Sequence, residues 1–149
     1  IKDPKSGGSA ATATTLRGVK AVLLSGSPGS FTVDEKISQA STGAVGRVVE
    51  FDSTNKILYY IQTRFNNFGL DTNGNLTAFS GTNTITGADS SATGTPSTST
   101  STVDNVSFTS GYAASELDAD TGDVVYVENR APITRASDQT ENVKLVIEF

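Results

Sequence analysis

The apolar residues of this chain occur in short segments separated by Gly, Asn, Asp and Pro, and no stretch keeps a helical period over any length. The clearest segment is at the C-terminal end, where Val143, Leu145, Ile147 and Phe149 face one side and Lys144 and Glu148 the other. The sequence therefore predicts a mainly β protein, an antiparallel sandwich or barrel with long Ser/Thr/Gly-rich loops and little helix.

The composition agrees with this fold class. Hydrophobic residues are only 36 %, but charged residues are also few, at 18 %, so the chain lacks the high charge of a disordered segment. Thr, Ser, Gly and Asn make up the difference. Thr suits a pleated surface and Gly and Asn suit tight turns, which favours many short strands.

The pattern predicts one β-rich domain over residues 19–149, preceded by an extended arm or linker over 1–18. Because the chain begins at Ile1 without an initiator Met, we expect it to be part of a longer protein. Expected strands cover residues 19–24, 31–33, 37–40, 45–51, 57–63, 76–79, 85–86, 103–108, 123–128 and 143–149.

Turns and loops are predicted between these strands. The connection Asp52–Asn55 indicates a hairpin, and Asn73-Gly74 favours a tight turn. Residues 87–102 are nearly all small or polar and are expected to form a flexible loop. One helical turn is expected over Ser115–Asp120, with Ser115 as its cap.

A faint internal repeat has a period of 48 residues. Its first copy contains Phe31, Ile37, Ala40, Ala44 and Gly46, and its second contains Phe79, Ile85, Ala88, Ala92 and Gly94. A repeated unit would place a large apolar anchor, a short strand and a tight turn in each copy. Chance in a chain rich in Gly, Ala and Thr is the alternative interpretation.

The net charge of −5 argues against nucleic-acid binding, which needs a basic face, and against electrostatic attachment to a membrane. No apolar run approaches the roughly 20 residues that span a bilayer. The chain has no Cys, which suits a protein made in a reducing cytoplasm.

The absence of His and Cys excludes catalytic triads and zinc sites built on these residues. Glu50 and Asp52 share one face of an expected strand and are the remaining candidates for a glycosidase-like carboxylate pair. A solvated strand face explains them better, because the chain has no Trp and few aromatic residues to line a sugar cleft.

Asp118, Asp120 and Asp123 are a weak candidate for a metal site. Asp118-x-Asp120-x-Gly122 has the alternating oxygen ligands and the Gly that calcium loops use, but it lacks a bidentate Glu at the proper distance. An acidic turn before a strand explains the residues equally well. Asp71-x-Asn73-Gly74 looks similar but reads as a hairpin turn.

Charges of both signs crowd a connection near the C-terminus, in a chain that is otherwise poor in them. A solvated turn is the simple explanation. A mutually neutralised network that meets a partner is the alternative. The candidate interface residues are Glu128, Asn129, Arg130, Pro132, Arg135, Asp138, Gln139 and Glu141.

The segment 121–149 contains, in order, the motifs Thr121-Gly122-Asp123, Tyr126, Glu128-Asn129-Arg130, Pro132-Ile133, Asp138-Gln139-Thr140-Glu141 and Phe149. In these motifs the segment closely resembles the C-terminal end of the baseplate wedge protein encoded by gene eight in T-even-like, contractile-tailed phages. Residues 1–120 resemble the versions found in marine cyanobacterial phages. Their Ser/Thr-rich loops depart from the T-even pattern.

The resemblance implies a structural virion protein of the tail baseplate, assembled in the host cytoplasm. It implies a homodimer that binds other baseplate wedge proteins, with no catalysis and no cofactor. Two other classes stay open: a receptor- or carbohydrate-binding β module of a tail fibre, and a virion-associated glycan hydrolase that uses Glu50 and Asp52.

Overall fold

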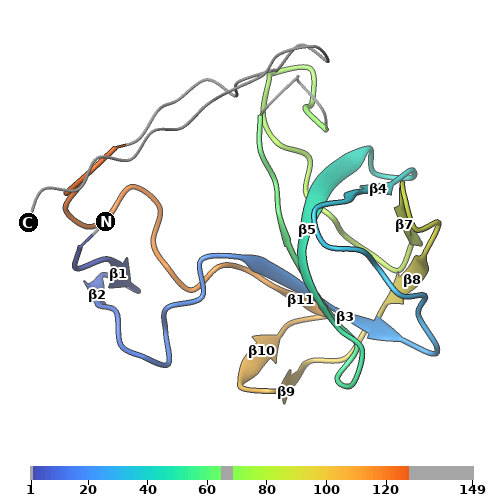
Figure 1. The fold of residues 1–149 in the computed structure, drawn as a ribbon, viewed down its shortest axis with the longest axis horizontal. Helices are drawn as coiled ribbons and strands as arrows, with labels where there is room; N and C mark the ends of the chain where they lie inside the picture. The colour runs from blue at the N-terminus through green and yellow to red at the C-terminus, as the bar shows by residue number, and fades with distance from the viewer. Residues whose placement is uncertain (1, 65–68, 128–149) are drawn as a thin grey trace, which may run out of the picture.

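The computed structural model describes residues 2–64 and 69–127, and this part of the chain is built from strands and turns (Figure 1). None of its segments is a helix that could cross a membrane. The strands are β1 (Lys5–Ser6), β2 (Ser9–Ala10), β3 (Lys20–Ser25), β4 (Lys36–Gln39), β5 (Ala44–Asp52), β6 (Ile57–Ile61), β7 (Ile85–Gly87), β8 (Thr93–Pro96), β9 (Ser101–Val103), β10 (Val106–Phe108) and β11 (Tyr112–Ala113).

The main sheet closes into an antiparallel barrel. Its strands follow the order β3-β6-β5-β4-β7-β8, and β8 pairs back onto β3 through Leu24↔Pro96 and Ser25↔Thr95. Strand β11 pairs with the start of β3, on the edge that β8 occupies further along. The expected mainly β, antiparallel and barrel-like fold is confirmed.

Two hydrophobic clusters lie on opposite faces of β3. Val22 and Leu24 point into the barrel, whereas Ala21 and Leu23 belong to a second cluster outside it. The second cluster is covered by the β9–β10 hairpin, whose Phe108 is 2 % exposed. Because both faces of β3 are covered, its apolar residues form a continuous run instead of an alternation.

The expected strands over 19–24, 37–40, 45–51, 57–63 and 85–86 correspond to β3, β4, β5, β6 and β7. The expected strand 103–108 is instead a hairpin, in which β9 and β10 are joined by Asp104 and Asn105, both at positive φ. Residues 31–33 form no strand, although Phe31 is buried in the barrel. In 76–79 only Leu76 pairs, with Leu70.

The prediction of a flexible loop over 87–102 is wrong, because this stretch contains β8 and the start of β9. Its small residues serve close packing. A Cβ atom at Gly94 would lie 2.6 Å from Leu24 Cδ1, and Ala92 fills part of the barrel interior. Small side chains therefore indicate a crowded strand here and not a mobile segment.

The predicted helical turn over Ser115–Asp120 is also wrong, since these residues form bends and a turn. The Ser115 hydroxyl donates to the Leu117 carbonyl (3.4 Å) and does not cap a helix. Of the expected strand 123–128, Asp123 forms a single bridge with Lys2, and Val124–Val127 lie in no strand. Glu128 and the expected strand 143–149 lie outside the described residues.

Residues 1–18 were expected to be an extended arm, but residues 5–10 form the β1–β2 hairpin, which lies apart from the barrel in Figure 1. Two chain segments join it to the barrel, and Arg17 and Glu116 hold them together. Glu116 Oε2 accepts from the Arg17 amide (3.0 Å), and the Arg17 carbonyl accepts from the Glu116 amide (2.7 Å). The Arg17 guanidinium also donates to the carbonyls of Val19 and Ala114.

Candidate interaction surface

The terminal lobe, defined here as residues 2–10 with 118–123, is organised around one carboxylate. The turn between β1 and β2 consists of Gly7 and Gly8 at φ of 58° and 77°, conformations that favour glycine. Both glycine amides donate to the Asp118 carboxylate, at 3.1 and 2.7 Å. Asp118 therefore fixes the hairpin against the returning chain.

Backbone contacts complete the lobe. The amide of each of Lys2 and Asp123 donates to the carbonyl of the other, at 2.8 and 2.7 Å. The Asp118 amide donates to the Lys5 carbonyl, and the Lys5 amide donates to the Thr121 hydroxyl. These hydrogen bonds join residues that are distant in sequence, and they fix the position at which the chain leaves the lobe at Val124.

The arrangement does not support the weak metal candidate Asp118, Asp120 and Asp123. Within residues 2–64 and 69–127, no group of three or more acidic side chains is placed to hold a metal ion. The Asp118 oxygens accept from the glycine turn, and Asp123 is fixed through its backbone. An acidic turn is the interpretation that the geometry favours.

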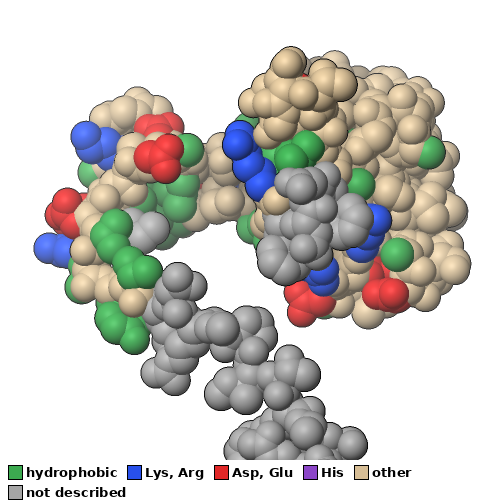
Figure 2. All heavy atoms as spheres, turned by 90° about the horizontal axis from the view of Figure 1, so that it is seen from above, with side chains coloured by type: hydrophobic (Ala, Val, Ile, Leu, Met, Phe, Trp, Pro, Cys, Tyr) green, Lys and Arg blue, Asp and Glu red, His purple; other side chains and the backbone are tan. Residues whose placement is uncertain are grey.

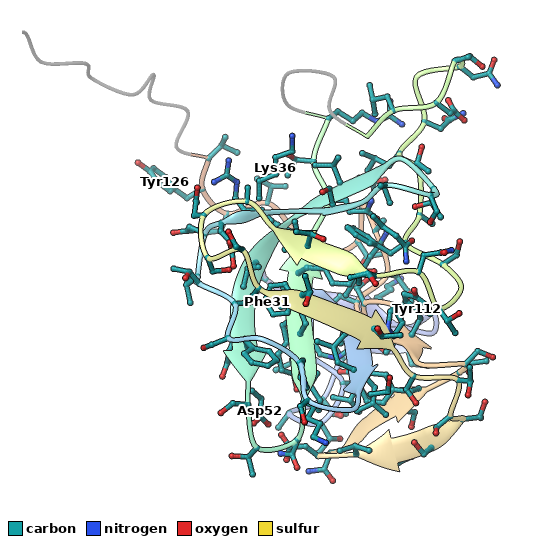
Figure 3. All side chains as sticks on the ribbon, turned by 90° about the vertical axis from the view of Figure 1, so that its right-hand side faces the viewer. Phe31, Lys36, Asp52, Tyr112 and Tyr126 are labelled. Carbon is teal, nitrogen blue, oxygen red and sulfur yellow. The ribbon has the colours of Figure 1, made fainter. Side chains whose placement is uncertain are left out.

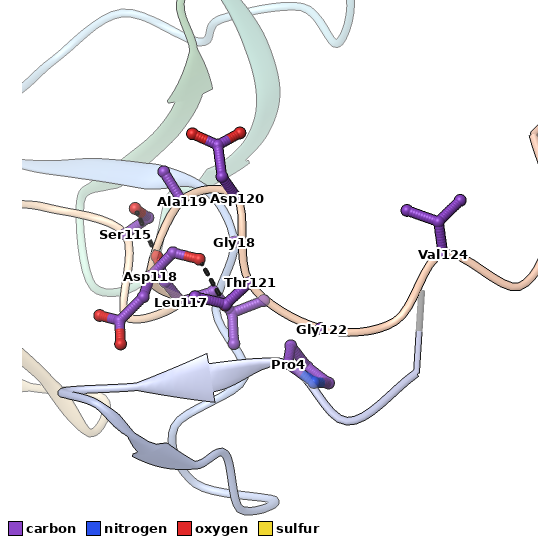
Figure 4. Close-up of a pocket in the computed structure, with 10 residues that line it drawn as sticks. All are labelled: Pro4, Gly18, Ser115, Leu117, Asp118, Ala119, Asp120, Thr121, Gly122 and Val124. Atoms are coloured by element: carbon purple, nitrogen blue, oxygen red, sulfur yellow. Dashed lines mark hydrogen bonds between the residues drawn. The ribbon is translucent and has the colours of Figure 1, made fainter.

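A hollow of about 770 Å³ lies where the lobe meets the chain that leads to the barrel. Figure 4 shows Pro4, Leu117 and Val124 among the residues that line it, with Asp118 and Asp120 also contributing. Its walls thus combine apolar side chains with two carboxylates.

The segment Val124–Val127 continues from this hollow as the most exposed apolar stretch of the described residues. Its four side chains are 68, 71, 71 and 72 % exposed. In Figure 3 Tyr126 points away from the barrel, and Figure 2 shows hydrophobic side chains gathered at the end of the molecule that carries the lobe. A contiguous exposed apolar stretch of this kind is typical of a surface that meets another protein.

The predicted interface residues follow directly after this segment, but they lie outside the described residues. They are Glu128, Asn129, Arg130, Pro132, Arg135, Asp138, Gln139 and Glu141. Their role in an interface stays a prediction.

The two carboxylates of the hypothetical hydrolase serve different purposes. Asp52 Oδ1 accepts from the amides of Thr54 and Asn55, and its Oδ2 accepts from the Asn55 side chain, which shapes the β5–β6 hairpin expected from the sequence. These hydrogen bonds, those from Asn55 above all, hold the pKa of the Asp52 carboxyl below its ordinary value. Glu50 is exposed beyond a bulge in β5.

Asp71 plays the same part in the other expected turn. Its Oδ1 accepts from the amides of Asn73 and Asn75, each at 2.8 Å. Gly74 has a φ of 78°, and Leu70 pairs with Leu76 across the turn, which confirms the hairpin interpretation. Hydrogen bonding, chiefly from the Asn75 amide, lowers the pKa of Asp71.

Sequence reasoning missed two buried polar side chains, Glu35 and Gln39, which are 1 % and 0 % exposed. Glu35 accepts from the amides of Thr32, Asp89 and Ser90 and from the Ser90 hydroxyl. Burial tends to raise the pKa of the Glu35 carboxyl, but these hydrogen bonds outweigh it, so the pKa is lowered. Only the alternation of β4 could have signalled that Gln39 faces inward with Ile37.

Residues 89–149 match the family model described as bacteriophage T4 Gp8. Neither the curated proteins nor the solved structures contain a match. The family match confirms the resemblance that the C-terminal motifs indicated, and it reaches upstream of residue 121 through β8–β11 of the barrel and its flanking hairpin.

Proposed function

Starting from the match of residues 89–149 to the Gp8 family of phage baseplate wedge proteins, we propose that this chain joins neighbouring wedge proteins during virion assembly. The family supports a structural role in the tail baseplate and a place in the virion. The family match is the observation that carries the proposal, and the geometry of the terminal lobe supports it.

In this proposal the barrel is a rigid support for the surfaces that contact partner proteins. Six strands form a closed ring, so their backbone hydrogen-bonding groups pair within the barrel. Stable association through the barrel by strand addition is therefore disfavoured. Contacts with partners are therefore assigned to surfaces outside the ring of strands, where Val124–Val127 is the most exposed apolar stretch of the described residues.

The lobe supplies a fixed point from which the chain continues toward its predicted interface residues. Asp118 and the Lys2–Asp123 backbone pair hold the lobe, and Val124–Val127 then expose four apolar side chains in succession. In our proposal this segment packs against a neighbouring wedge protein or a second copy of the chain. The charged residues from Glu128 onward select the partner by charge complementarity.

We assign no catalytic step to the chain. The family is one of structural baseplate proteins, and Asp52 is used to shape a hairpin. Glu50 and Asp52 thus act as surface and turn residues in this proposal, and the cytoplasm of the host is the place of assembly.

The test is co-assembly of the full chain with the other wedge proteins, followed by size-exclusion chromatography. Arg130→Glu reverses one predicted interface charge and is expected to reduce incorporation into the wedge complex while the thermal transition of the barrel is retained. Glu50→Lys reverses a charge on the barrel surface and is the matched control, with normal incorporation expected. Normal incorporation of Arg130→Glu would contradict the predicted interface, and failure of the unaltered chain to enter any wedge complex would refute the function.

A further inference from the structure

The 48-residue repeat corresponds to two hairpins with the same register. In the first hairpin β4 pairs with β5 and Ile37 lies opposite Gly46, whereas in the second β7 pairs with β8 and Ile85 lies opposite Gly94. Each Ile is fully buried, and each Gly lies where a Cβ atom would come within 3 Å of a neighbouring atom. Chance similarity in sequence does not explain an identical pairing register.

The two hairpins are related by an approximate two-fold axis. Strands β4 and β7 run antiparallel and pair Ser38 with Thr86, which are themselves repeat partners. Ile37 faces Gly87 in the same ladder, so exchange of the two copies reproduces the pairing. Four further repeat positions, Phe31, Ala44, Phe79 and Ala92, all belong to the cluster inside the barrel.

The turn of each hairpin repeats the same hydrogen bonds. The Thr42 hydroxyl accepts from the Ala44 amide (3.1 Å) and donates to Gln39 Oε1 (2.9 Å). Its repeat partner, the Ser90 hydroxyl, accepts from the Ala92 amide (3.0 Å) and donates to Glu35 Oε1 (2.7 Å).

The second hydrogen bond to each of these buried oxygens repeats as well. Glu35 Oε1 accepts from the amide of Thr32, which follows Phe31, at 2.7 Å. Gln39 Oε1 accepts from the amide of Ser80, which follows Phe79, at 3.0 Å. Two oxygens from different residues thus hold equivalent places in the two halves, each between a loop amide and a turn hydroxyl.

The residues that supply these oxygens differ because the side chain that fills the space between loop and turn comes from a different repeat position in each half. In one half Glu35 fills the space beside Gly87, where a Cβ atom would lie 2.5 Å from Glu35 Oε2. In the other half the repeat partner of Gly87 is Gln39, which supplies the oxygen, and the repeat partner of Glu35 is the exposed Asn83.

The backbone explains why one half uses an amide and the other a carboxylate. The Glu35 carbonyl accepts from the Val48 amide (3.0 Å), but the repeat partner of Val48 is Pro96, which has no amide hydrogen. The Asn83 carbonyl instead accepts from Gln39 Nε2 (2.7 Å). The Glu35 carboxylate has no N–H group with which to donate. Its Oε2 atom instead accepts hydrogen bonds from the amides of Asp89 and Ser90.

We infer that the barrel contains an internal duplication, in which two equivalent hairpins pair through β4 and β7. Each hairpin is held in place by one buried polar side chain, which we call its clasp. Glu35 is the clasp of one half and Gln39 is the clasp of the other. The two side chains position the loops after Phe31 and Phe79 against the turns of the hairpins. The barrel is therefore stabilised at two equivalent places, and neither of them requires a partner protein.

The test converts the first clasp into a copy of the second in the full chain. Glu35→Asn removes the carboxylate, and Gly87→Gln introduces a side chain where Glu35 leaves no room; each alone is expected to lower the melting temperature. Gly87 has an ordinary backbone conformation, and the three atoms nearest to an added Cβ atom all belong to the Glu35 carboxylate. The double variant is expected to melt above both single variants, whereas melting at or below the less stable one would overturn the equivalence.

A matched control combines Glu35→Asn with Gly94→Gln, which crowds Leu24 and not Glu35. No recovery is expected in this double variant, and recovery would contradict a specific exchange at the clasp.

Milder variants keep the inference testable if the larger changes prevent folding. Thr42→Val and Ser90→Ala each remove the repeated hydroxyl, and equivalence predicts similar losses in melting temperature that add in the double variant. A clear loss in only one of them would refute the equivalence of the two halves.

Discussion

Removal of the Glu35 carboxylate is expected to destabilise the barrel more than removal of any exposed carboxylate. Glu35→Ala deletes the acceptor of four hydrogen bonds from Thr32, Asp89 and Ser90. A hydrogen bond to a charged group contributes about 1.5–3 kcal/mol, but these four share one group, so their contributions do not add in full. We therefore expect a loss of about 2–4 kcal/mol in the free energy of unfolding.

The same carboxylate predicts a pH dependence. Because its pKa is lowered from the ordinary value of 4.5 in the folded protein, Glu35 contributes stability above that pH. The contribution is lost as the pH falls through the lowered folded pKa, where the carboxylate takes up a proton. Glu35→Gln keeps one acceptor oxygen, so it should be less stable than the unaltered chain near neutral pH and lose less stability on acidification.

The assay is urea unfolding followed by circular dichroism at pH 7 and at a series of lower pH values. The expected loss corresponds to a fall in melting temperature of about 5–15 °C for a chain of this size. Glu50→Ala is the control, with a change within about 0.5 kcal/mol because Glu50 is exposed. If Glu35→Ala unfolds at the same urea concentration as the Glu50→Ala control, the clasp does not stabilise the fold.

Three further variants test other parts of the structure. Phe108→Ala removes a side chain that is 2 % exposed from the second cluster and should cost about 3–5 kcal/mol in urea unfolding, and a loss below 1 kcal/mol would contradict its packing role. Asp118→Ala should speed amide hydrogen exchange at Gly7 and Gly8 without changing exchange in β5, and unchanged exchange at both glycines would rule out this role for Asp118. Val125→Asp, at a position 71 % exposed, should leave the free energy of unfolding within about 0.5 kcal/mol but reduce co-assembly with wedge proteins, and full co-assembly would remove this segment from the interface.

Period and turn chemistry predicted most of the barrel. The strands over 37–40 and 45–51 and the turns at Asp52–Asn55 and Asn73-Gly74 follow from local alternation and from residues that favour tight turns. These features depend on neighbours in sequence, so sequence reasoning finds them. Closure of the barrel depends on Leu24 and Pro96, which are distant in sequence, and no local pattern signals it.

Two failures have a common physical cause. Residues 87–102 were expected to be a loop because they are small and polar, but Gly94 and Ala92 are small because β8 is crowded against Leu24 and the barrel interior. Glu35 was passed over because a buried carboxylate looks like any surface acid until its donors are known. In both cases the deciding neighbour lies far along the chain.

The repeat shows the opposite case, since a weak pattern carried correct structural information. Phe31 and Ile37 recur as Phe79 and Ile85, and all four are buried in one cluster. The candidate interaction surface was predicted less completely. The sequence pointed to the charged residues after Glu128, whereas the structure adds the terminal lobe and Val124–Val127.

The central proposal is that this chain is a structural part of the tail baseplate wedge, and a cryo-electron-microscopy map of the assembled phage particle tests it most directly. The account predicts density for the six-stranded barrel within the wedge, with the terminal lobe and Val124–Val127 against a neighbouring subunit. A map in which the wedge lacks this barrel, or in which that segment faces only solvent, would contradict it.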